Sequence, residues 1–317
     1  MSDNNTQTNT DREIQNLGLS NKDITRQRLL NKDGTFNSRR VGLPFFDSFN
    51  FYHYLVGVSW FKFAVIILSG YVLLNIIFAA VYYLLGVDTH LLGVIASSEA
   101  EKFLESFFFS AQSFTTVGYG RISPVGFWAS SVSAFESLIG LMALAIATGL
   151  FYGRFSRPVT KILYSKNAVI APFKDVNAFQ FRIANKQRSE MIDVEVRVMF
   201  SILEDVNNNS PKRKYFNLKL EYDKINFFSL LWVVNHIIDS ESPLNGLTEK
   251  DLNEGHAEFL ILLQGFDDTF SQNVHSRSSY RHEEIVWSGK FVNIYGFDDD
   301  GRTIVSLDKI SEIEKSV

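Results

Sequence analysis

Two long apolar segments constrain the fold of this 317-residue chain more than any other feature. Residues 63–86 contain no charged side chain, and residues 127–152 contain a single one, Glu136. As a helix, the first segment would extend about 36 Å at about 1.5 Å per residue, which exceeds the roughly 30 Å thickness of the hydrocarbon core of a bilayer. The sequence therefore predicts two membrane-spanning helices joined by a short polar loop.

The loop between these segments holds the hexapeptide Thr115, Thr116, Val117, Gly118, Tyr119 and Gly120. A potassium pore replaces the water shell of the ion with rings of backbone carbonyl oxygens, so its lining strand turns successive carbonyls the same way. Gly118 and Gly120 can adopt the positive φ that such a strand needs, and the Thr116 hydroxyl can add another oxygen ring. Val117 and Tyr119 can brace the strand from behind. A Gly-flanked aromatic residue in a soluble chain is usually a surface turn, but between two spans it predicts a filter that binds K⁺ through backbone carbonyls only.

The stretch before the hexapeptide, residues 101–114, is rich in Phe and has a helical pattern. It is too short to cross a bilayer, so we interpret it as a re-entrant pore helix. The partial negative charge at its C-terminus would point to the middle of the pore, where it would favour a cation that is losing its water.

Basic side chains flank both apolar segments on the side away from the loop. They are Arg39, Arg40 and Lys62 before or at the start of the first segment, and Arg154, Arg157 and Lys161 after the second. The loop itself carries more acidic than basic side chains. The positive-inside rule therefore predicts cytoplasmic termini for a multi-pass protein of the cell (inner) membrane. The first 40 residues are too polar for a signal peptide, so the first span would act as its own insertion signal.

Composition and motifs argue against several classes of function. The chain has no cysteine, which excludes disulfides, thiolate metal sites and cysteine nucleophiles. Its six histidines lack metal-ligand spacing, and we find no nucleophile elbow and no phosphate-binding Gly-rich loop. A formal net charge of −4 without a dense basic region argues against nucleic acid as a partner. We expect neither an enzyme nor a cofactor, with K⁺ as the permeant ion.

The composition changes after residue 161 to short segments rich in β-branched and aromatic residues. They are residues 179–183, 192–202, 215–222, 259–263, 284–287 and 291–297, separated by turn signals. This pattern predicts strands of a β-sandwich. Asp298–Gly301 is expected to be a hairpin turn, with a cation-attracting acidic patch as the alternative. The chain has no internal repeat, so fourfold pore symmetry would come from four separate chains.

Several stretches resemble the inward-rectifier potassium channel family, and its prokaryotic branch in particular. They are residues 28–37, 109–120, 149–158, 239–252 and 276–287, and they distribute the resemblance over nearly the whole chain. Other two-helix potassium channels carry the filter without such a sandwich. The resemblance implies a homotetramer, in which each chain meets three identical subunits, with an immunoglobulin-like cytoplasmic domain and gating by anionic lipids.

These observations together predict a membrane α-helical pore with a cytoplasmic immunoglobulin-like β-sandwich. The expected order is a partly disordered N-terminal segment (1–43), an interfacial slide helix (44–58), an outer helix (59–86), a loop with pore helix and filter (87–126), an inner helix (127–158) and the sandwich (159–317). Pro44 and apolar residues at helical spacing favour the slide helix.

The inner helix contains the candidate gate and cavity residues Leu144, Gly149 and Tyr152. Tyr152 stands where similar prokaryotic channels place a bulky side chain at the bundle crossing, so four copies could close the pore; an interfacial aromatic anchor is the alternative. Gly140 and Gly149 permit either bending or close helix packing. Leu144 stands where strong rectifiers have an acid, so the resemblance implies only weak block by Mg²⁺ or polyamines; Ba²⁺ is the expected pore blocker.

The support behind the filter departs from the eukaryotic pattern. Gln112 and Ile122 stand where those channels place a Glu and an Arg that pair, and Arg121 follows Gly120 where many potassium channels have Asp. Glu136 is the candidate replacement, because an ionisable residue within a span is costly and usually functional. The alternative is a structural, hydrogen-bonded Glu.

The basic residues that flank the spans are also candidates for binding anionic phospholipids, since each attracts such headgroups near the membrane surface. Their alternative role is topology alone. We therefore expect a lipid-modulated potassium channel. Two rival functions remain: a poorly selective cation channel, and a membrane-anchored sensor with a vestigial pore.

Overall fold

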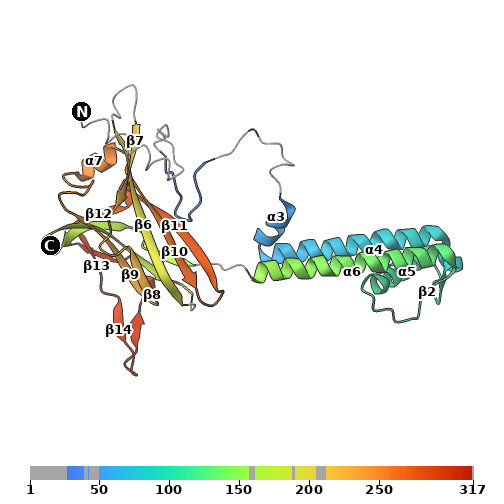
Figure 1. Ribbon diagram of the computed structural model, residues 1–317. Helices are drawn as coiled ribbons and strands as arrows, with labels where there is room; N and C mark the ends of the chain where they lie inside the picture. The colour runs from blue at the N-terminus through green and yellow to red at the C-terminus, as the bar shows by residue number, and fades with distance from the viewer. Residues whose placement is uncertain are drawn as a thin grey trace. The chain divides into compact units, whose positions relative to one another are not determined.

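The computed structural model describes residues 27–38, 42, 50–156, 161–187, 190–204 and 212–315. They form two compact units (Figure 1). One comprises residues 41–157, and the other residues 1–40 together with residues 158–317. Each unit is described by itself.

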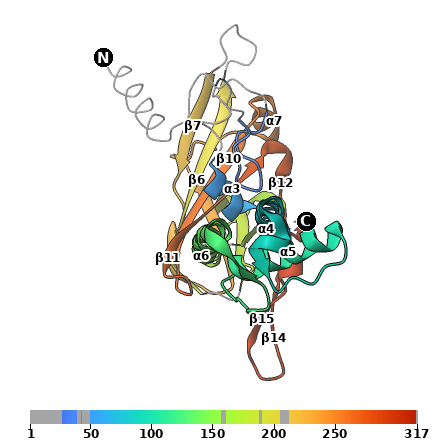
Figure 2. The same cartoon turned by 90° about the vertical axis from the view of Figure 1, so that its right-hand side faces the viewer.

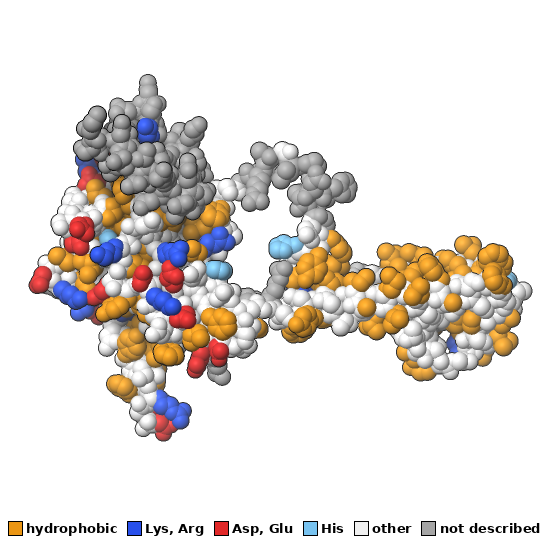
Figure 3. Space-filling view, viewed as in Figure 1, with side chains coloured by type: hydrophobic (Ala, Val, Ile, Leu, Met, Phe, Trp, Pro, Cys, Tyr) orange, Lys and Arg blue, Asp and Glu red, His pale blue; other side chains and the backbone are white. Residues whose placement is uncertain are grey.

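The helical unit contains the four described helices of residues 50–156. They are α3 (Phe51–Gly57), α4 (Trp60–His90), α5 (Glu99–Phe114) and α6 (Gly126–Phe155), with a two-stranded pairing of β1 (Leu91–Leu92) and β2 (Ser123–Pro124). The helices α4 and α6 lie side by side, and α5 packs against both (Figures 1 and 2). Both α4 and α6 are long and apolar enough to cross a membrane, and hydrophobic side chains cover them in Figure 3.

The expected end of the outer helix at residue 86 coincides with a kink in α4, beyond which a further short helical stretch runs to His90. Gly86 has φ 102° and ψ 100°, so the helix is kinked there, and the Thr89 hydroxyl donates to the Gly86 carbonyl at 3.1 Å. Glycine tolerates this conformation because it has no Cβ.

The interfacial helix is described only in its second half. The structure has α3 at Phe51–Gly57, where Asn50 caps the helix by accepting a hydrogen bond from the His53 amide at 3.0 Å. Residues 43–49, with the expected start at Pro44, lie outside the described residues. Leu55 and Val56 are buried, whereas Phe51 is exposed, so the helix is amphipathic.

The other unit is built around two five-stranded sheets. The first has the order β11-β10-β6-β7, with β8 also paired to β6, and the second has the order β12-β4-β5-β3, with β9 paired to β5. The strands are β3 (Ile162–Tyr164), β4 (Ala168–Phe173), β5 (Val176–Asn185), β6 (Met191–Glu204), β7 (Lys212–Leu218), β8 (Lys224–Phe228), β9 (Leu231–Ile238), β10 (Glu258–Asp267), β11 (Gln272–Arg281) and β12 (Ile285–Trp287). Only β12 and β4 pair in parallel within these sheets. A short helix, α7 (Glu249–Glu254), precedes β10.

The core of this unit consists of the inward faces of both sheets. Phe179 of β5 stacks on Phe259 of β10 at 4.1 Å between ring centroids, and Phe200 of β6 lies 5.0 Å from Phe259. All three are fully buried. The β-rich fold was predicted from the alternation of such residues with polar ones.

Two expected strands were wrong in extent. The predicted strand 215–222 ends at Leu218, and the predicted strand 291–297 is divided between β13 (Gly289–Phe291), paired with β16 (Ile313–Lys315), and β14 (Tyr295–Phe297), paired with β15 (Thr303–Val305). The expected turn at Asp298–Gly301 is confirmed: it closes the β14–β15 hairpin, with the Gly301 amide donating to the Asp298 carbonyl at 3.0 Å.

The N-terminal segment 28–37 docks on β10 and β11. The buried Glu258 carboxylate accepts hydrogen bonds from the backbone amides of Leu29 at 2.8 Å and Leu30 at 3.1 Å. Arg28 forms an ion pair with Glu284 at 2.5 Å. Two carboxylates therefore hold the start of the described chain to the sandwich.

We expect acid to release this segment. Burial raises the pKa of the Glu284 carboxyl, but hydrogen bonds from the Arg281 amide, Lys32 and Arg28 outweigh burial and hold the pKa below its ordinary value of 4.5. A carboxyl with a lowered pKa stabilises the folded state above its ordinary pKa, and this stabilisation is lost as the pH falls through the lowered value. Amide exchange of residues 28–37, corrected for its intrinsic pH dependence, should therefore accelerate below pH 4.5. In Glu284→Gln the amides of this segment should exchange faster than in the wild type at neutral pH. If their exchange kept the pH dependence of the wild type, Glu284 would not be the group whose protonation releases the segment.

Candidate pore, filter support and gate

The pore helix α5 positions the hexapeptide. Ser98 caps its N-terminus by accepting a hydrogen bond from the Glu101 amide at 3.2 Å, and the helix ends at Phe114. At the other end the Thr115 hydroxyl donates to the Ala111 carbonyl at 2.7 Å. The hexapeptide therefore leaves directly from the C-terminus of α5.

The backbone of the hexapeptide alternates in conformation. Gly118 has φ 53° and Gly120 has φ 80°, which confirms the expected positive values, and Thr116 also has a positive φ of 57°. The Gln112 carbonyl accepts hydrogen bonds from the amides of Val117 at 3.0 Å and Gly118 at 3.3 Å. The conformation of Thr116 was not predicted from the sequence, because β-branched residues such as threonine rarely adopt a positive φ.

The hexapeptide lies on the surface of the single chain. All six residues are exposed, with Tyr119 at 79%. The amides of Thr115 to Gly118 donate to carbonyls of α5, but exposed carbonyls of the segment must still find partners or solvent within a membrane. Further copies of the chain around an axis would provide that environment.

Glu136 connects three helices. Its side chain is fully buried in α6, and it accepts hydrogen bonds from the hydroxyl of Tyr82 in α4 at 2.6 Å and from that of Ser110 in α5 at 2.5 Å. The Ser110 hydroxyl also lies 3.0 Å from the side-chain oxygen of Asn75. Glu136 therefore contacts the pore helix rather than the hexapeptide itself.

Gly140 lies where α6 packs closely against the end of the pore helix. A Cβ atom built on Gly140 would lie 1.8 Å from the backbone oxygen of Phe114. The structure therefore favours the packing role over the hinge role for this glycine. A Cβ built on Gly149 would have no neighbour within 4 Å in the single chain, so its role stays open.

An ion pair lies directly after the hexapeptide in the sequence. Arg121 forms an ion pair with Glu105 of α5 and donates to the Gly93 carbonyl at 3.4 Å. The sequence indicated Arg121 only as a departure from the usual Asp. Its partner lies 16 residues away, so no local pattern could have predicted the pair.

Candidate cavity and gate residues lie on α6. Leu144 and Tyr152 are 64% and 74% exposed, and Thr148 between them is exposed as well. Residues four apart on a helix share a face, so the three form one stripe. The sequence analysis had not named Thr148 as a cavity residue.

The basic residues that flank the spans differ in their surroundings. Lys62 and Lys161 are exposed. Arg154, by contrast, donates to three backbone carbonyls near the end of α3. Arg39, Arg40 and Arg157 lie outside the described residues.

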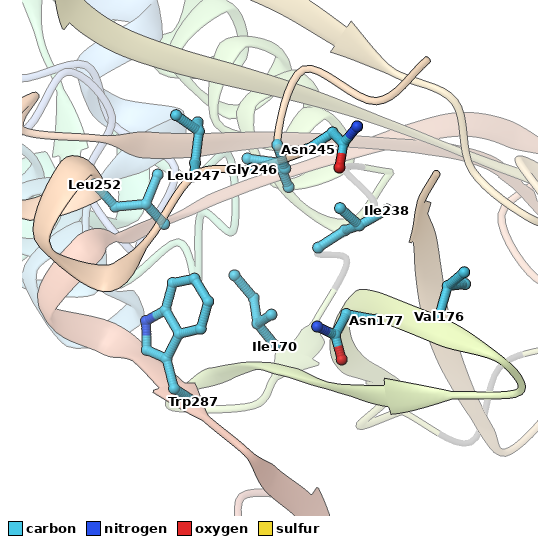
Figure 4. A pocket seen from close by; sticks show the side chains of 10 residues that line it. Ile170, Val176, Asn177, Ile238, Asn245, Gly246, Leu247, Leu252 and Trp287 are labelled. Atoms are coloured by element: carbon cyan, nitrogen blue, oxygen red, sulfur yellow. The ribbon is translucent and has the colours of Figure 1, made fainter. Parts of the chain in front are cut away.

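A cavity of about 350 Å³ opens on the β-rich unit (Figure 4). Its wall combines apolar side chains with polar surface that includes the amide side chains of Asn177 and Asn245. The residues that line it are Ile170, Val176, Asn177, Ile238, Leu244, Asn245, Gly246, Leu247, Leu252 and Trp287. Because no charged side chain lines the cavity, it offers no complement to an ionic ligand.

Two membrane-spanning helices, a re-entrant helix and a filter-like segment define the pore domain of an ion channel. Comparison with family models agrees: residues 70–157 match the ion channel family, and residues 162–316 match the C-terminal domain of inward rectifier potassium channels.

Relatives extend the match over nearly the whole chain. The chain is 36% identical over 289 residues to the inward rectifier potassium channel Kirbac3.1 of Paramagnetospirillum magnetotacticum, covering 90% of this chain and 95% of that one. It is 23% identical to the inward rectifier potassium channel irk-1 of Caenorhabditis elegans, covering 86% and 54% of the two chains, and 27% identical to the mouse ATP-sensitive inward rectifier potassium channel 15, covering 67% and 59%.

This chain belongs to the inward-rectifier potassium channel family. It is a membrane protein and an ion channel rather than an enzyme. Channels of this family are tetramers that conduct K⁺.

Proposed function

We propose that four copies of this chain form a passive K⁺ pore whose filter is Thr115–Gly120. The observation that carries this proposal is the alternation of positive φ at Thr116, Gly118 and Gly120 directly after the pore helix. K⁺ would bind to backbone carbonyls and move between adjacent carbonyl sites, without any chemical step. Glu136 would hold the pore helix, and through it the filter, in place.

Flux into liposomes that contain the purified tetramer tests this function. We expect K⁺ flux to exceed Na⁺ flux and to be blocked by Ba²⁺. Equal Na⁺ and K⁺ flux would instead establish the poorly selective pore, and flux of neither ion in any lipid would favour the membrane-anchored sensor.

Orientation and rectification belong to the same proposal. The basic residues that flank the spans would place both termini in the cytoplasm, and the acidic excess of the loop would face outward. Leu144 provides no carboxylate for Mg²⁺ or a polyamine in the exposed stripe of α6. Rectification by these blockers would therefore be weak.

Anionic phospholipids are the proposed modulators. Lys62 and Lys161 have the exposed ammonium groups that such a role needs, each attracting a headgroup by about 1 kcal/mol near the surface. Flux with and without an anionic phosphoinositide would give the sign of the effect. Identical flux in both would reject the modulation.

The gate is proposed at Tyr152, whose side chain is 74% exposed on the same stripe as Leu144. Four bulky side chains around an axis would close the pore by steric block and dewetting. Tyr152→Ala should therefore raise K⁺ leak by about tenfold or more, measured in liposomes without activating lipid. If Tyr152 is instead an interfacial anchor, a correctly assembled Tyr152→Ala tetramer should leak no more K⁺ than the wild type.

A further inference from the structure

Four fully buried polar side chains form one connected group across α4, α5 and α6. They are Tyr82 and Asn75 of α4, Ser110 of α5 and Glu136 of α6. The Tyr82 hydroxyl lies 2.6 Å from Glu136 Oε2, and the Ser110 hydroxyl lies 2.5 Å from Glu136 Oε1 and 3.0 Å from Asn75 Oδ1. Because all four are buried within a single chain, neither lipid nor a neighbouring subunit contacts them.

The orientation of the Asn75 amide is fixed by its other contact. Its Nδ2 atom lies 2.7 Å from the Tyr71 carbonyl oxygen. A carbonyl oxygen only accepts hydrogen bonds, so the amide nitrogen must face it. The atom that faces Ser110 is therefore Oδ1, which has no hydrogen to donate. The hydrogen between these two residues must come from the Ser110 hydroxyl.

The Ser110 hydroxyl has a single hydrogen, yet it lies between two acceptors when Glu136 is ionised. A carboxylate only accepts hydrogen bonds, so it would compete with the Asn75 oxygen for that hydrogen. One of the two contacts, at 2.5 Å or at 3.0 Å, would then join two oxygens without a hydrogen of its own. A protonated carboxyl resolves this conflict, because Glu136 Oε1 donates to Ser110 and Ser110 donates to Asn75.

The parts of α4, α5 and α6 around Glu136 contain no cation to balance a carboxylate. Residues 63–87, 106–120 and 122–153 include no Lys, Arg or His. The titratable side chain that contacts Glu136 is Tyr82. A buried carboxylate without a cationic partner is unfavourable, because burial removes the water that stabilises its charge. A neutral carboxylic acid avoids this penalty.

We propose that Glu136 is a neutral carboxylic acid that donates to Ser110, and that Asn75 is a positioning residue that sets this direction. The Ser110 hydroxyl thus accepts from Glu136 rather than donating to it. Hydrogen bonds then run from Tyr82 through Glu136 and Ser110 to Asn75. They hold the pore helix to both spanning helices without a fixed negative charge beside it. This inference rests on the proposed role of Glu136 in holding the pore helix.

Infrared spectroscopy of the full-length tetramer in lipid bilayers tests the protonation state, because a carboxylic acid and a carboxylate absorb at different frequencies. At pH 7 the wild type should show an acid carbonyl band that Glu136→Gln lacks. Glu99→Gln is the matched control: Glu99 is exposed and paired with Lys102, so this variant should lose carboxylate absorption and keep the acid band. Loss of carboxylate absorption in Glu136→Gln, with the acid band unchanged, would overturn the inference.

Asn75→Leu tests whether Asn75 sets the direction. Without the Asn75 oxygen the Ser110 hydrogen can turn to Glu136, so the acid form loses the hydrogen bond that only it permits. The pH at which half of the acid band is lost should fall by about 0.7 pH unit, since one hydrogen bond corresponds to about a fivefold change in proton affinity. Ser69→Ala removes an exposed hydroxyl of the same helix and should keep the wild-type midpoint. An unmoved midpoint in Asn75→Leu would show that Asn75 has no positioning role.

The infrared readout separates this inference from the proposed function, because it does not depend on conduction. An acid band in a tetramer without K⁺-selective flux would reject the proposed filter and leave the neutral Glu136 in place. If flux is K⁺-selective and Glu136→Leu abolishes it, but the wild type has no acid band, Glu136 supports the filter as a carboxylate and only the inference fails.

Discussion

Gly140→Ala is expected to abolish K⁺-selective flux or to reduce it by at least about tenfold. The added Cβ would lie 1.8 Å from the Phe114 oxygen and 2.7 Å from its carbonyl carbon, both of which are backbone atoms. Backbone cannot rotate away as a side chain can, so α6 and the end of α5 must separate. Overpacking of this kind costs about 1–3 kcal/mol, and here the displaced residue directly precedes the filter.

Gly70→Ala is the matched control for this prediction. Gly70 also lies within a spanning helix, α4, but a Cβ there would meet no atom within 4 Å. Alanine is a better helix former than glycine, so the tetramer should assemble and conduct as the wild type does. Wild-type selectivity and flux in Gly140→Ala would show that the close approach to Phe114 does not constrain the filter.

Glu136→Leu is expected to lose most of the selective flux as well, and to lower the thermal stability of the tetramer. A leucine removes the acceptor of the Tyr82 hydroxyl and leaves the Ser110 hydroxyl with the Asn75 oxygen alone, so the link from the pore helix to α6 is lost. A buried polar group that loses its partner costs about 1–3 kcal/mol. Because Ser110 belongs to the pore helix, the loss should alter Na⁺ permeability and not stability alone.

Glu136→Gln separates hydrogen bonding from charge. The glutamine oxygen can accept from Tyr82, and its amide can donate to the Ser110 hydroxyl, so the connection between the helices is retained. We expect most of the selective flux to survive in this variant. If Glu136→Gln and Glu136→Leu were equally impaired, the carboxylate charge rather than the hydrogen bonds would be required. If both conducted normally, Glu136 would have no part in supporting the filter.

Local sequence patterns predicted the elements of the pore well. The two apolar segments became α4 and α6, and the stretch ending at Phe114 became α5, because hydrophobicity and helical spacing are properties of neighbouring residues. The positive φ of Gly118 and Gly120 followed from residue type, since glycine tolerates that conformation without strain.

The ends of individual helices and strands were predicted less accurately than their existence. The expected end of the outer helix at residue 86 coincides with the non-helical backbone of Gly86, although a further short helical stretch of α4 follows to His90. The predicted strand 291–297 is two strands with different partners. Strand ends depend on which neighbour supplies the hydrogen bonds, and a single segment does not specify its neighbour.

By itself, the sequence determined the class of protein: two spans, a re-entrant helix, a filter hexapeptide and a β-rich domain, all of which are encoded in local composition and spacing. The roles of Gly140, Glu136 and Arg154 could be read only from contacts between helices that lie far apart in the sequence. Gly140 is a packing glycine because Phe114 lies against it, Glu136 joins three helices, and Arg154 holds the carbonyls of α3. Each of these contacts joins residues at least 26 positions apart, and such contacts are set by how helices pack rather than by the residues beside them in the chain.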